Sequence, residues 1–244
     1  MRDEDVINDR LEAHYTHACE IYGANAVVGV FLYGSQNYNC DTEASDIDTK
    51  CIIVPDLYHL AIAPYKTVER HIGDEHCECM TISHAIANFK KQNINFLEIL
   101  FTHYAFINPQ YYDLWVNLCE MREEIAHYDP IAAIKSIGHQ ALHTIRQNPM
   151  DPKKIANGYR LYDFLVRYAK GIPYADCLVP APEAHNYIMG LKRGTTKPMI
   201  EDSKFLLGIF DTLVTKDWTF QKNPIDEQLN NHILSFVERR LSLD

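Results

Sequence analysis

Hydrophobic residues in the first half of the chain follow two different periods. Apolar positions recur at the helical spacing over residues 3–22, and Gly23 ends this pattern, which predicts an N-terminal helix. Runs rich in apolar, β-branched and aromatic residues predict four strands, at about 26–33, 47–54, 76–82 and 104–108. Shorter helices are expected near 57–62, after a capping Ser83, and over 95–101, where Asn95 would cap the helix that carries Glu98.

The second half of the chain shows helical patterns only. Asp129-Pro130 and Asp151-Pro152 each place a capping acid before a proline suited to the first helical position, and Asn223-Pro224 is expected to begin the last helix in the same way. That helix should run to about Leu241, whereas 172–182, rich in proline and small residues, predicts a loop. The order of elements predicts an α+β fold, with a mixed sheet and flanking helices followed by a helical domain.

Composition narrows the class of protein. Hydrophobic residues make up 47% of the chain, enough for a sizeable core, and no apolar run reaches the roughly 18 residues of a membrane span. The first residues lack the apolar region of a signal peptide, so we expect a cytoplasmic protein that does not bind membranes. The net charge of −10, from 23 basic and 33 acidic residues, argues against a large general nucleic-acid surface but leaves room for a local basic groove.

Cysteine usage also fits the cytoplasm. The seven cysteines are odd in number and scattered, as expected of reduced thiols. Cys77 and Cys79, near His71 and His76, raise the alternative of a zinc site. No second cysteine pair stands at ligand spacing, and strand alternation accounts for two small buried thiols, so we favour the structural interpretation.

The segment from Phe31 to Pro55 carries the chemistry. A buried strand ends at Gly34-Ser35, where a small residue lets a phosphate approach the backbone and the hydroxyl can donate to it. Asp46 and Asp48 stand two apart in the next strand, so both carboxylates should project from one face while Ile47 points into the core. Adjacent like charges favour a bound cation, and Mg²⁺ prefers hard oxygen ligands together with substrate phosphates.

The sequence of this segment resembles that of a known superfamily. Gly34-Ser35, a spacer of ten residues and Asp46-x-Asp48 are similar to the DNA polymerase beta nucleotidyltransferases. A longer part of the sequence, residues 33–50 together with 92–100, resembles the minimal branch labelled the RNA repair pathway DNA polymerase beta family. The clear resemblance covers about residues 26–110. One departure is Asn39, where relatives often carry glycine, although asparagine also tolerates positive φ.

The resemblance implies a domain division and a metal site. A polymerase-beta-like catalytic domain would span 1–125, and a helical domain at 126–244 would close the nucleotide cleft. A third carboxylate would complete the metal site, and Glu78 is the best candidate, because alternation places it on one face with His76. Asp74 and Glu75 are the alternatives, expected in a loop before the strand, and a packing role is favoured for His76.

The implied chemistry is two-metal phosphoryl transfer. Two Mg²⁺ ions, with Mn²⁺ as a possible replacement, would be held by Asp46, Asp48 and Glu78, one carrying the triphosphate and the other activating the attacking hydroxyl. Lys153, Asn157 and Arg160 share one face of a predicted helix by their spacing. This face has two interpretations of similar weight, a triphosphate contact and an ordinary solvated surface. The complete set of expected nucleotide contacts is Gly34, Ser35, Gln36, Tyr38, Lys50, Lys153, Asn157 and Arg160.

Three functions fit these residues. The first is template-independent transfer of NMP from an NTP to an acceptor hydroxyl with release of pyrophosphate, with an RNA 3′ end as the leading acceptor because of the resemblance. The second is the same transfer to a protein side chain or small molecule, which the negative net charge favours. The third is a non-catalytic nucleotide-binding module, against which the pair of aspartates argues.

Overall fold

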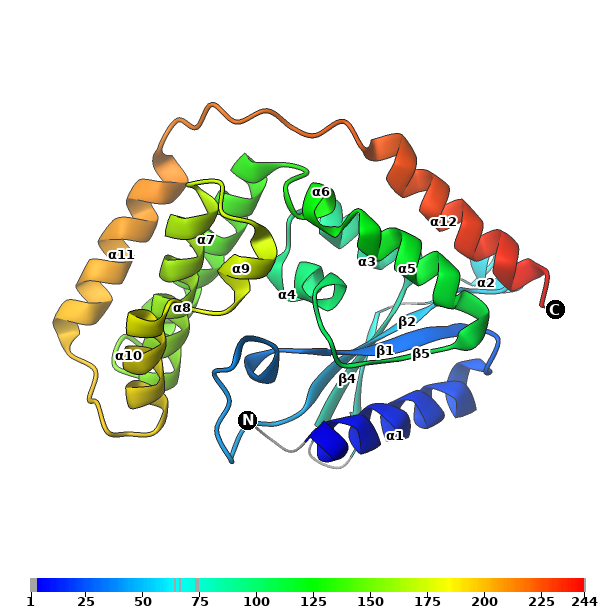
Figure 1. The fold of residues 1–244 in the computed structure, drawn as a ribbon, viewed down its shortest axis with the longest axis horizontal. Coiled ribbons are helices and arrows are strands. Elements are labelled where there is room, and N and C mark those ends of the chain that lie inside the picture. The colour runs from blue at the N-terminus through cyan, green and yellow to red at the C-terminus, as the bar shows by residue number, and fades with distance from the viewer. Residues whose placement is uncertain (1–3, 64, 66, 73–74, 244) are drawn as a thin grey trace.

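A five-stranded mixed sheet forms one side of the molecule, and a group of helices forms the other (Figure 1). The computed structural model describes residues 4–63, 65, 67–72 and 75–243, and for 68–72 it describes the backbone only. The sheet with its flanking helices, followed by a helical C-terminal part, confirms the predicted α+β class.

The sheet has the order β3-β4-β2-β1-β5. β1 runs antiparallel to both β2 and β5, while β4 lies parallel to β2 and antiparallel to β3. One of these strands, β3, was not predicted. The bounds are β1 (Val27–Tyr33), β2 (Asp48–Ile53), β3 (Val68–Ile72), β4 (Glu75–Thr81) and β5 (Ala105–Ile107).

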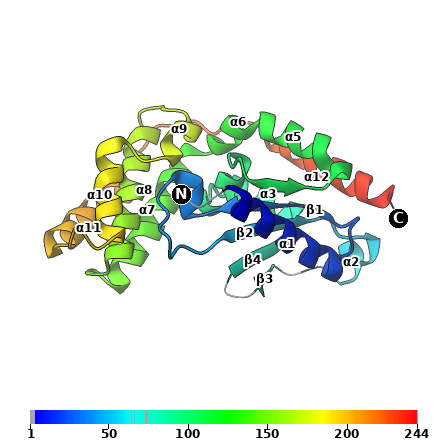
Figure 2. The same ribbon diagram turned by 60° about the horizontal axis from the view of Figure 1, so that its bottom comes forward.

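Helices cover both faces of the sheet (Figure 2). The side chains of Ile47, Cys51 and Ile53 belong to a buried cluster under α1 (Glu4–Tyr22), which packs along β1, β2 and β5. Ile52 and Met80 point to the opposite face and join a second buried cluster. That face is covered by α3 (Ile82–Lys90), α5 (Tyr112–Glu120) and α12 (Asp226–Leu241).

Local capping differs from the predictions at two short helices. Thr81, not Ser83, caps α3, because its hydroxyl accepts from the N–H of His84. Asn93, not Asn95, caps α4 (Ile94–Leu97), which continues into the turn η2 (Glu98–Leu100). The short helix α2 (Leu57–Ala61) lies as expected.

The helical part begins after α6 (Arg122–Ala126). Asp129 and Asp151 accept hydrogen bonds from the first-turn N–H groups of the helices that follow them, which confirms both predicted starts. The predicted loop at 172–182 contains a short helix, and the last helix begins at Asp226 after an Ile225 cap, so Asn223-Pro224 does not start it. The bounds are α7 (Pro130–Gln147), α8 (Pro152–Tyr168), α9 (Tyr174–Leu178), α10 (Pro182–Lys192) and α11 (Ile200–Thr215).

The chain crosses back to the sheet before it ends. Residues 216–225 lead from α11 to α12, which packs on α3 and α5 (Figure 1). One buried cluster also continues from the sheet through α6 into α7 and α8, across the predicted boundary at residue 125. The division at that residue stays a prediction, with α12 on the sheet side of the molecule. Among the described residues, no helix combines the length and apolar composition needed to cross a membrane.

Candidate functional site

A cleft of about 340 Å³ lies between one end of the inner strands β1 and β2 and helices α7, α8 and α10. The sheet side contributes the residues after β1 and before β2, and the helical side contributes most of the basic residues. Its lining residues are Gly34, Ser35, Tyr38, Cys40, Ser45, Asp46, Asp48, Thr144, Lys153, Lys154, Ala156, Asn157, Arg160, Ile188 and Lys192.

The turn after β1 forms the floor of the cleft. Gly34 has a φ of 91°, a conformation that L side chains rarely adopt, and the chain then enters the short η1 helix (Ser35–Tyr38). Asn39 ends this helix in the left-handed region with a φ of 56°, a conformation that asparagine tolerates, as expected from the sequence. A Cβ atom added at Gly34 would lie 3.5 Å from Oδ2 of Asp48, which shows how closely the turn approaches this carboxylate.

Antiparallel pairing explains that approach. Tyr33, the last residue of β1, is the register partner of Asp48, the first residue of β2. Asp46 precedes the strand instead of lying within it, yet Ile47 is fully buried on the opposite side and both aspartates line the cleft. The predicted shared orientation of the two carboxylates is therefore present.

The surroundings of Asp48 disfavour its negative charge. Burial raises the pKa of its carboxyl group, and the neighbouring Asp46 raises it further, while His76 and Lys153 act in the opposite direction. Two neighbouring carboxylates, one of them with a raised pKa, favour the binding of a cation in the cleft, because the cation offsets their repulsion. The residues thus fit a Mg²⁺ ion, which is commonly held by one or two carboxylates plus substrate phosphates.

The predicted third carboxylate does not join this pair. Glu78 lies in β4 opposite Lys50 of β2, and the two side chains form an ion pair. Neither residue lines the cleft. Within the part of the chain that the structure describes, no three His, Cys, Asp or Glu side chains gather as metal ligands. A three-carboxylate site with two ions stays a prediction, and the geometry supports the two-carboxylate part of it.

The other candidates for a third acid lie elsewhere. The carboxylate of Glu75 approaches Arg10 at 3.6 Å and His14 at 3.3 Å on the α1 side of the sheet. Asp74 lies outside the described residues, as does the side chain of His71. Cys77 and Cys79 are buried in the cluster under α1, in accord with the structural interpretation of these thiols.

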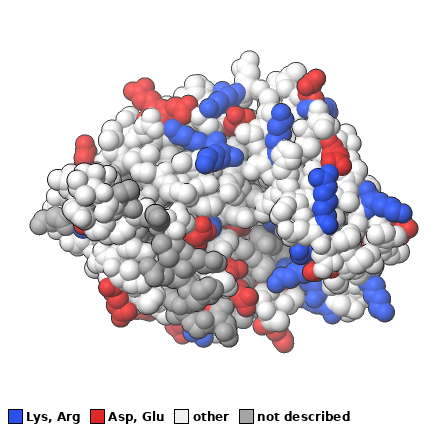
Figure 3. Space-filling view, turned by 180° about the vertical axis from the view of Figure 1, so that it is seen from behind, with Lys and Arg blue, Asp and Glu red and all other residues white. Residues whose placement is uncertain are grey.

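The opposite wall of the cleft is basic. Lys153, Asn157 and Arg160 of α8, which were predicted to share one helix face, all line it. α10 adds Lys192, whose ammonium group donates to the carbonyl of Cys40. The space-filling view shows Lys and Arg side chains on the helical side of a hollow between the two parts of the molecule (Figure 3). The lysine on α10 belongs to a basic run in the sequence, but the sequence alone did not connect it with this site.

Arg160 is the most constrained of these cations. Its side chain is only 5% exposed, and the guanidinium lies 4.1 Å from the ring centre of Tyr38. Nε donates to the side-chain oxygen of Asn157 at 3.2 Å, whereas Nη1 is buried and has no hydrogen-bond partner among the described residues. A buried guanidinium with an unpaired donor, next to a cleft that has one acidic and one basic wall, is suited to bind an anionic oxygen of a ligand.

Two predicted nucleotide contacts lie away from the cleft. Lys50 is 1% exposed, and its ammonium group lies 4.0 Å and 4.3 Å from the ring centres of Tyr33 and Phe96. Gln36 occupies the far side of the η1 turn and lines a different pocket. Both residues stand close to the motif in sequence, but strand register and turn geometry direct them elsewhere.

Glu98 supports the turn from below, a role the sequence did not reveal. Its Oε1 accepts from the N–H of Gly34 at 3.2 Å, and its main-chain carbonyl accepts from the side chain of Asn37 at 3.3 Å. The residue is 3% exposed, and burial raises the pKa of its carboxyl group to about 7 although Arg160 and the Gly34 N–H oppose the shift. The turn therefore rests on a group that titrates near neutrality.

Stability should depend on pH through this residue. The folded protein holds the Glu98 proton more tightly than the unfolded chain, whose glutamate pKa is about 4.3, so stability falls as pH rises from about 4.3 to about 7. We expect Glu98→Gln to lack this loss, and the variant should gain roughly 2–4 kcal/mol relative to the parent across that interval. Denaturant unfolding at a series of pH values measures the difference.

The exposed Glu124 provides the control for this experiment. Glu124→Gln removes the same charge without touching the turn, so its stability should follow the parent at every pH. A constant difference between Glu98→Gln and the parent from pH 4 to 8 would show that Glu98 is not protonated more readily in the folded state.

Comparison with known proteins adds a structural neighbour. No family model matches the sequence, and no curated protein is similar to it at a significant level. Among solved structures, a nucleotidyltransferase-like protein from Exiguobacterium sibiricum 255-15 covers 96% of this chain and 75% of its own, at 11% identity and a TM-score of 0.31. The residues of the cleft are therefore the main indication of function.

Proposed function

We propose that this protein transfers a nucleoside monophosphate from an NTP to an acceptor hydroxyl and releases pyrophosphate. The observation that carries this proposal is the charge separation of the cleft, in which Asp46 and Asp48 on the sheet side oppose Lys153, Arg160 and Lys192 on the helical side. A triphosphate needs cationic groups along its oxygens, and the reacting phosphorus needs a centre of positive charge held by carboxylates.

Each wall has its own part in binding. Ser35 can donate its hydroxyl to a phosphate oxygen at the floor of the cleft. The unpaired Nη1 of Arg160 and the ammonium group of Lys153 supply the charge that compensates the triphosphate. Tyr38, packed under the guanidinium of Arg160, fixes the direction of that group.

Asp46 and Asp48 are the residues that would hold Mg²⁺, with Mn²⁺ as a possible replacement. When bound, the ion supplies Lewis-acid stabilisation of the charge that develops on the phosphate oxygens. The two carboxylates would hold the ion and so orient the triphosphate. Because burial raises the pKa of Asp48, a bound cation would offset an unfavourable negative charge. A second ion with Glu78 as a ligand would require the ion pair with Lys50 to open.

For the acceptor we propose an RNA 3′ end, without a template, because the motif and the segment 92–100 resemble the RNA repair branch. The net charge of −10 keeps a protein side chain or small molecule as the alternative. A cytoplasmic location is consistent with seven free cysteines.

The test is transfer of label. Each α-³²P-labelled NTP is incubated with Mg²⁺ or Mn²⁺ and, in parallel, with total RNA, the protein itself and a small-molecule mixture. Label on RNA is the expected result, and label on protein or small molecules alone would favour the alternative acceptor. Metal-dependent NTP binding without transfer to any acceptor would indicate a binding module and contradict the proposed enzyme.

Removal of the guanidinium should weaken nucleotide binding. We expect Arg160→Gln to raise the dissociation constant for an NTP by at least about tenfold, since a charge-assisted hydrogen bond from a buried group contributes about 1.5–3 kcal/mol. Equilibrium binding of a fluorescent NTP in Mg²⁺ measures the loss. Because the parent residue is buried with an unpaired donor, the variant should stay folded.

Arg146 serves as the matched control, because it is exposed on α7 and pairs with Asp211 outside the cleft. Arg146→Gln should bind the NTP as the parent does. Equal affinity of the Arg160 variant and the parent would place the triphosphate away from α8.

A further inference from the structure

A second pocket, of about 550 Å³, lies on the other side of the η1 turn from the cleft. Gln36 and Asn37 of the turn line it, whereas Ser35 and Tyr38 of the same turn line the cleft, and the two hollows share no described residue. The remaining walls come from α1, from the segment 101–104 and from α9. A ligand in this pocket would therefore not compete with one in the cleft.

Gln36 is the unusual residue of this pocket. It is 2% exposed, and both its amide nitrogen and its amide oxygen are buried without a hydrogen-bond partner among the described residues. Leaving such a group unpaired costs about 1–3 kcal/mol, and an apolar side chain of similar size would avoid this cost. An amide that lowers stability while it lines a pocket indicates a ligand that pairs with it.

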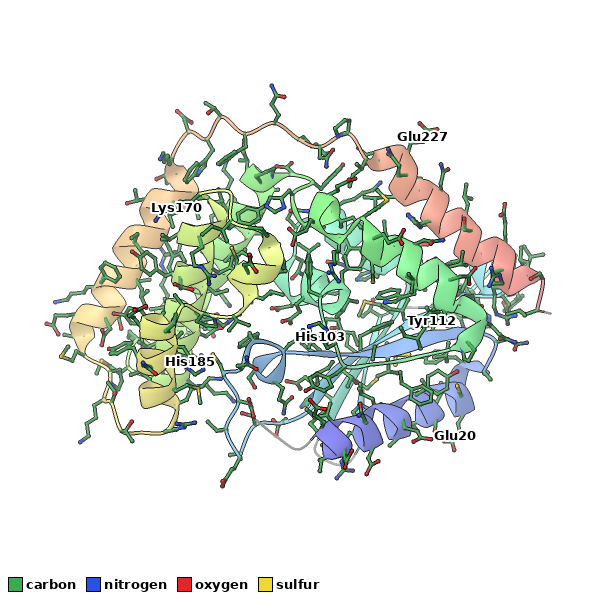
Figure 4. All side chains as sticks on the ribbon, in the orientation of Figure 1. Glu20, His103, Tyr112, Lys170, His185 and Glu227 are labelled. Atoms are coloured by element: carbon green, nitrogen blue, oxygen red, sulfur yellow. The ribbon has the colours of Figure 1, made fainter. Side chains whose placement is uncertain are left out.

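The turn that presents Gln36 is itself fixed. Glu98 holds the side chain of Asn37 from one side, and Nε2 of His185 lies 2.7 Å from the carbonyl of Asn39 on the other. The stick view shows His185 on α10 and His103 on the opposite side of the turn, near the sheet (Figure 4). The backbone that carries Gln36 is therefore held in place before a ligand arrives, which lowers the entropic cost of binding.

The remaining lining groups define the ligand class. No Lys or Arg lines the pocket within the described part of the chain, so it does not suit a phosphate or carboxylate. Polar groups come from Asn8, Asn37 and Tyr104, whose hydroxyl donates to Glu4, an acid that also lines the pocket. Apolar surface comes from Phe101 and Leu178. A neutral ring with hydrogen-bonding edges matches this combination.

We propose that this pocket binds a nucleobase, with the amide of Gln36 pairing with adjacent donor and acceptor atoms on the base edge. Side-chain amides read bases in this bidentate way, and aromatic and apolar side chains receive the flat faces. The base can belong to a free nucleoside or to the terminal nucleotide of an RNA acceptor. The second source rests on the proposed function, whereas base binding as such does not.

The test uses the four ribonucleosides without metal or triphosphate. Saturation-transfer NMR and calorimetric titration of the full chain should detect at least one of them. Gln36→Met, which keeps the length of the side chain but removes the amide, should weaken that binding by at least about tenfold, in line with the loss of a paired amide. Gln110→Met, the same change at an exposed position outside the pocket, should bind as the parent does.

Thermal unfolding gives an independent readout. Gln36→Met should melt at the same temperature as the parent or higher, since it removes an unpaired buried amide. Gln36→Leu is the second apolar variant, with the same expected result. Failure of all four nucleosides to bind at millimolar concentration, or unchanged binding by both Gln36 variants, would overturn the proposal.

Two competition experiments show where the nucleoside binds and whether the natural ligand is a free nucleoside or an RNA end. Inorganic tripolyphosphate, a probe for the basic cleft, should not displace the nucleoside, and displacement would put the base in the cleft and overturn the second site. An oligoribonucleotide that ends in the preferred base should displace the nucleoside if the pocket holds an RNA acceptor, whereas a free nucleoside site would be unaffected. Absence of nucleotidyl transfer would leave all these binding results unchanged.

Discussion

Asp48→Asn is expected to lower the rate of nucleotidyl transfer by about a thousandfold or more. The carboxylate lies where the phosphate turn meets β2, and a cation held there contributes several kcal/mol to stabilisation of the transition state. The fold should survive, because burial and Asp46 already raise the pKa of Asp48 and make its charge unfavourable. Label transfer and thermal unfolding, each measured with and without Mg²⁺, test both parts of this expectation.

The substitution should lower the rate of label transfer but should not lower the melting temperature measured without metal. Without metal, the melting temperature of Asp48→Asn should equal or exceed that of the parent at neutral pH, where the parent carries the unfavourable charge. Added Mg²⁺ should stabilise the parent but not the variant, since only the parent binds it in the folded state. Asp217→Asn, an exposed acid after α11, is the control and should match the parent in both assays. Full activity of Asp48→Asn with Mg²⁺ would refute the metal assignment.

The second large effect concerns stability. Glu78→Gln is expected to destabilise the protein by about 3–5 kcal/mol, because it leaves the ammonium group of Lys50, only 1% exposed, without its carboxylate. For a chain of this size the melting temperature should fall by roughly 6–20 °C, at about 2–4 °C per kcal/mol. The double variant Lys50→Met/Glu78→Gln should recover most of the loss, and a thermodynamic cycle over the two positions measures the coupling.

This experiment also decides the role of Glu78. Glu183→Gln, at an exposed position on α10, removes the same charge and should leave stability unchanged. If Glu78→Gln instead melts like the parent and loses transfer activity, Glu78 acts at the metal site as the resemblance implied. A large loss of stability with the remaining folded protein still active would assign the residue to the sheet.

Local sequence determined much of the site. Asp46 and Asp48 line the cleft and Ile47 between them is buried, as the predicted alternation requires, although only Asp48 lies within β2. Helical spacing likewise put Lys153, Asn157 and Arg160 on one face, and that face lines the cleft. These relations span at most eight residues, so local backbone geometry fixes them.

Short elements were harder to predict. β3 contains Glu69, Arg70 and His71 between two apolar residues, a composition that carries little strand signal, and its pairing with β4 supplies the missing support. The helix α9 lies in a segment rich in proline, where the carboxylate of Glu123 accepts from the N–H groups of Tyr174 and Ala175. β3 is thus stabilised by the next strand along the chain, and α9 by a carboxylate about 50 residues earlier in the sequence.

Tertiary structure alone decided the surroundings of three charged or polar side chains. Glu78 meets Lys50 because β4 lies parallel to β2 in one particular register, and Glu98 reaches Gly34 across 64 residues. Gln36 faces away from the cleft because the η1 turn rotates successive side chains to different sides. The sequence by itself determined which residues share a strand or helix face, since that depends on the local backbone. Which group each of them meets depends on the packing of remote segments, and only the folded chain decides it.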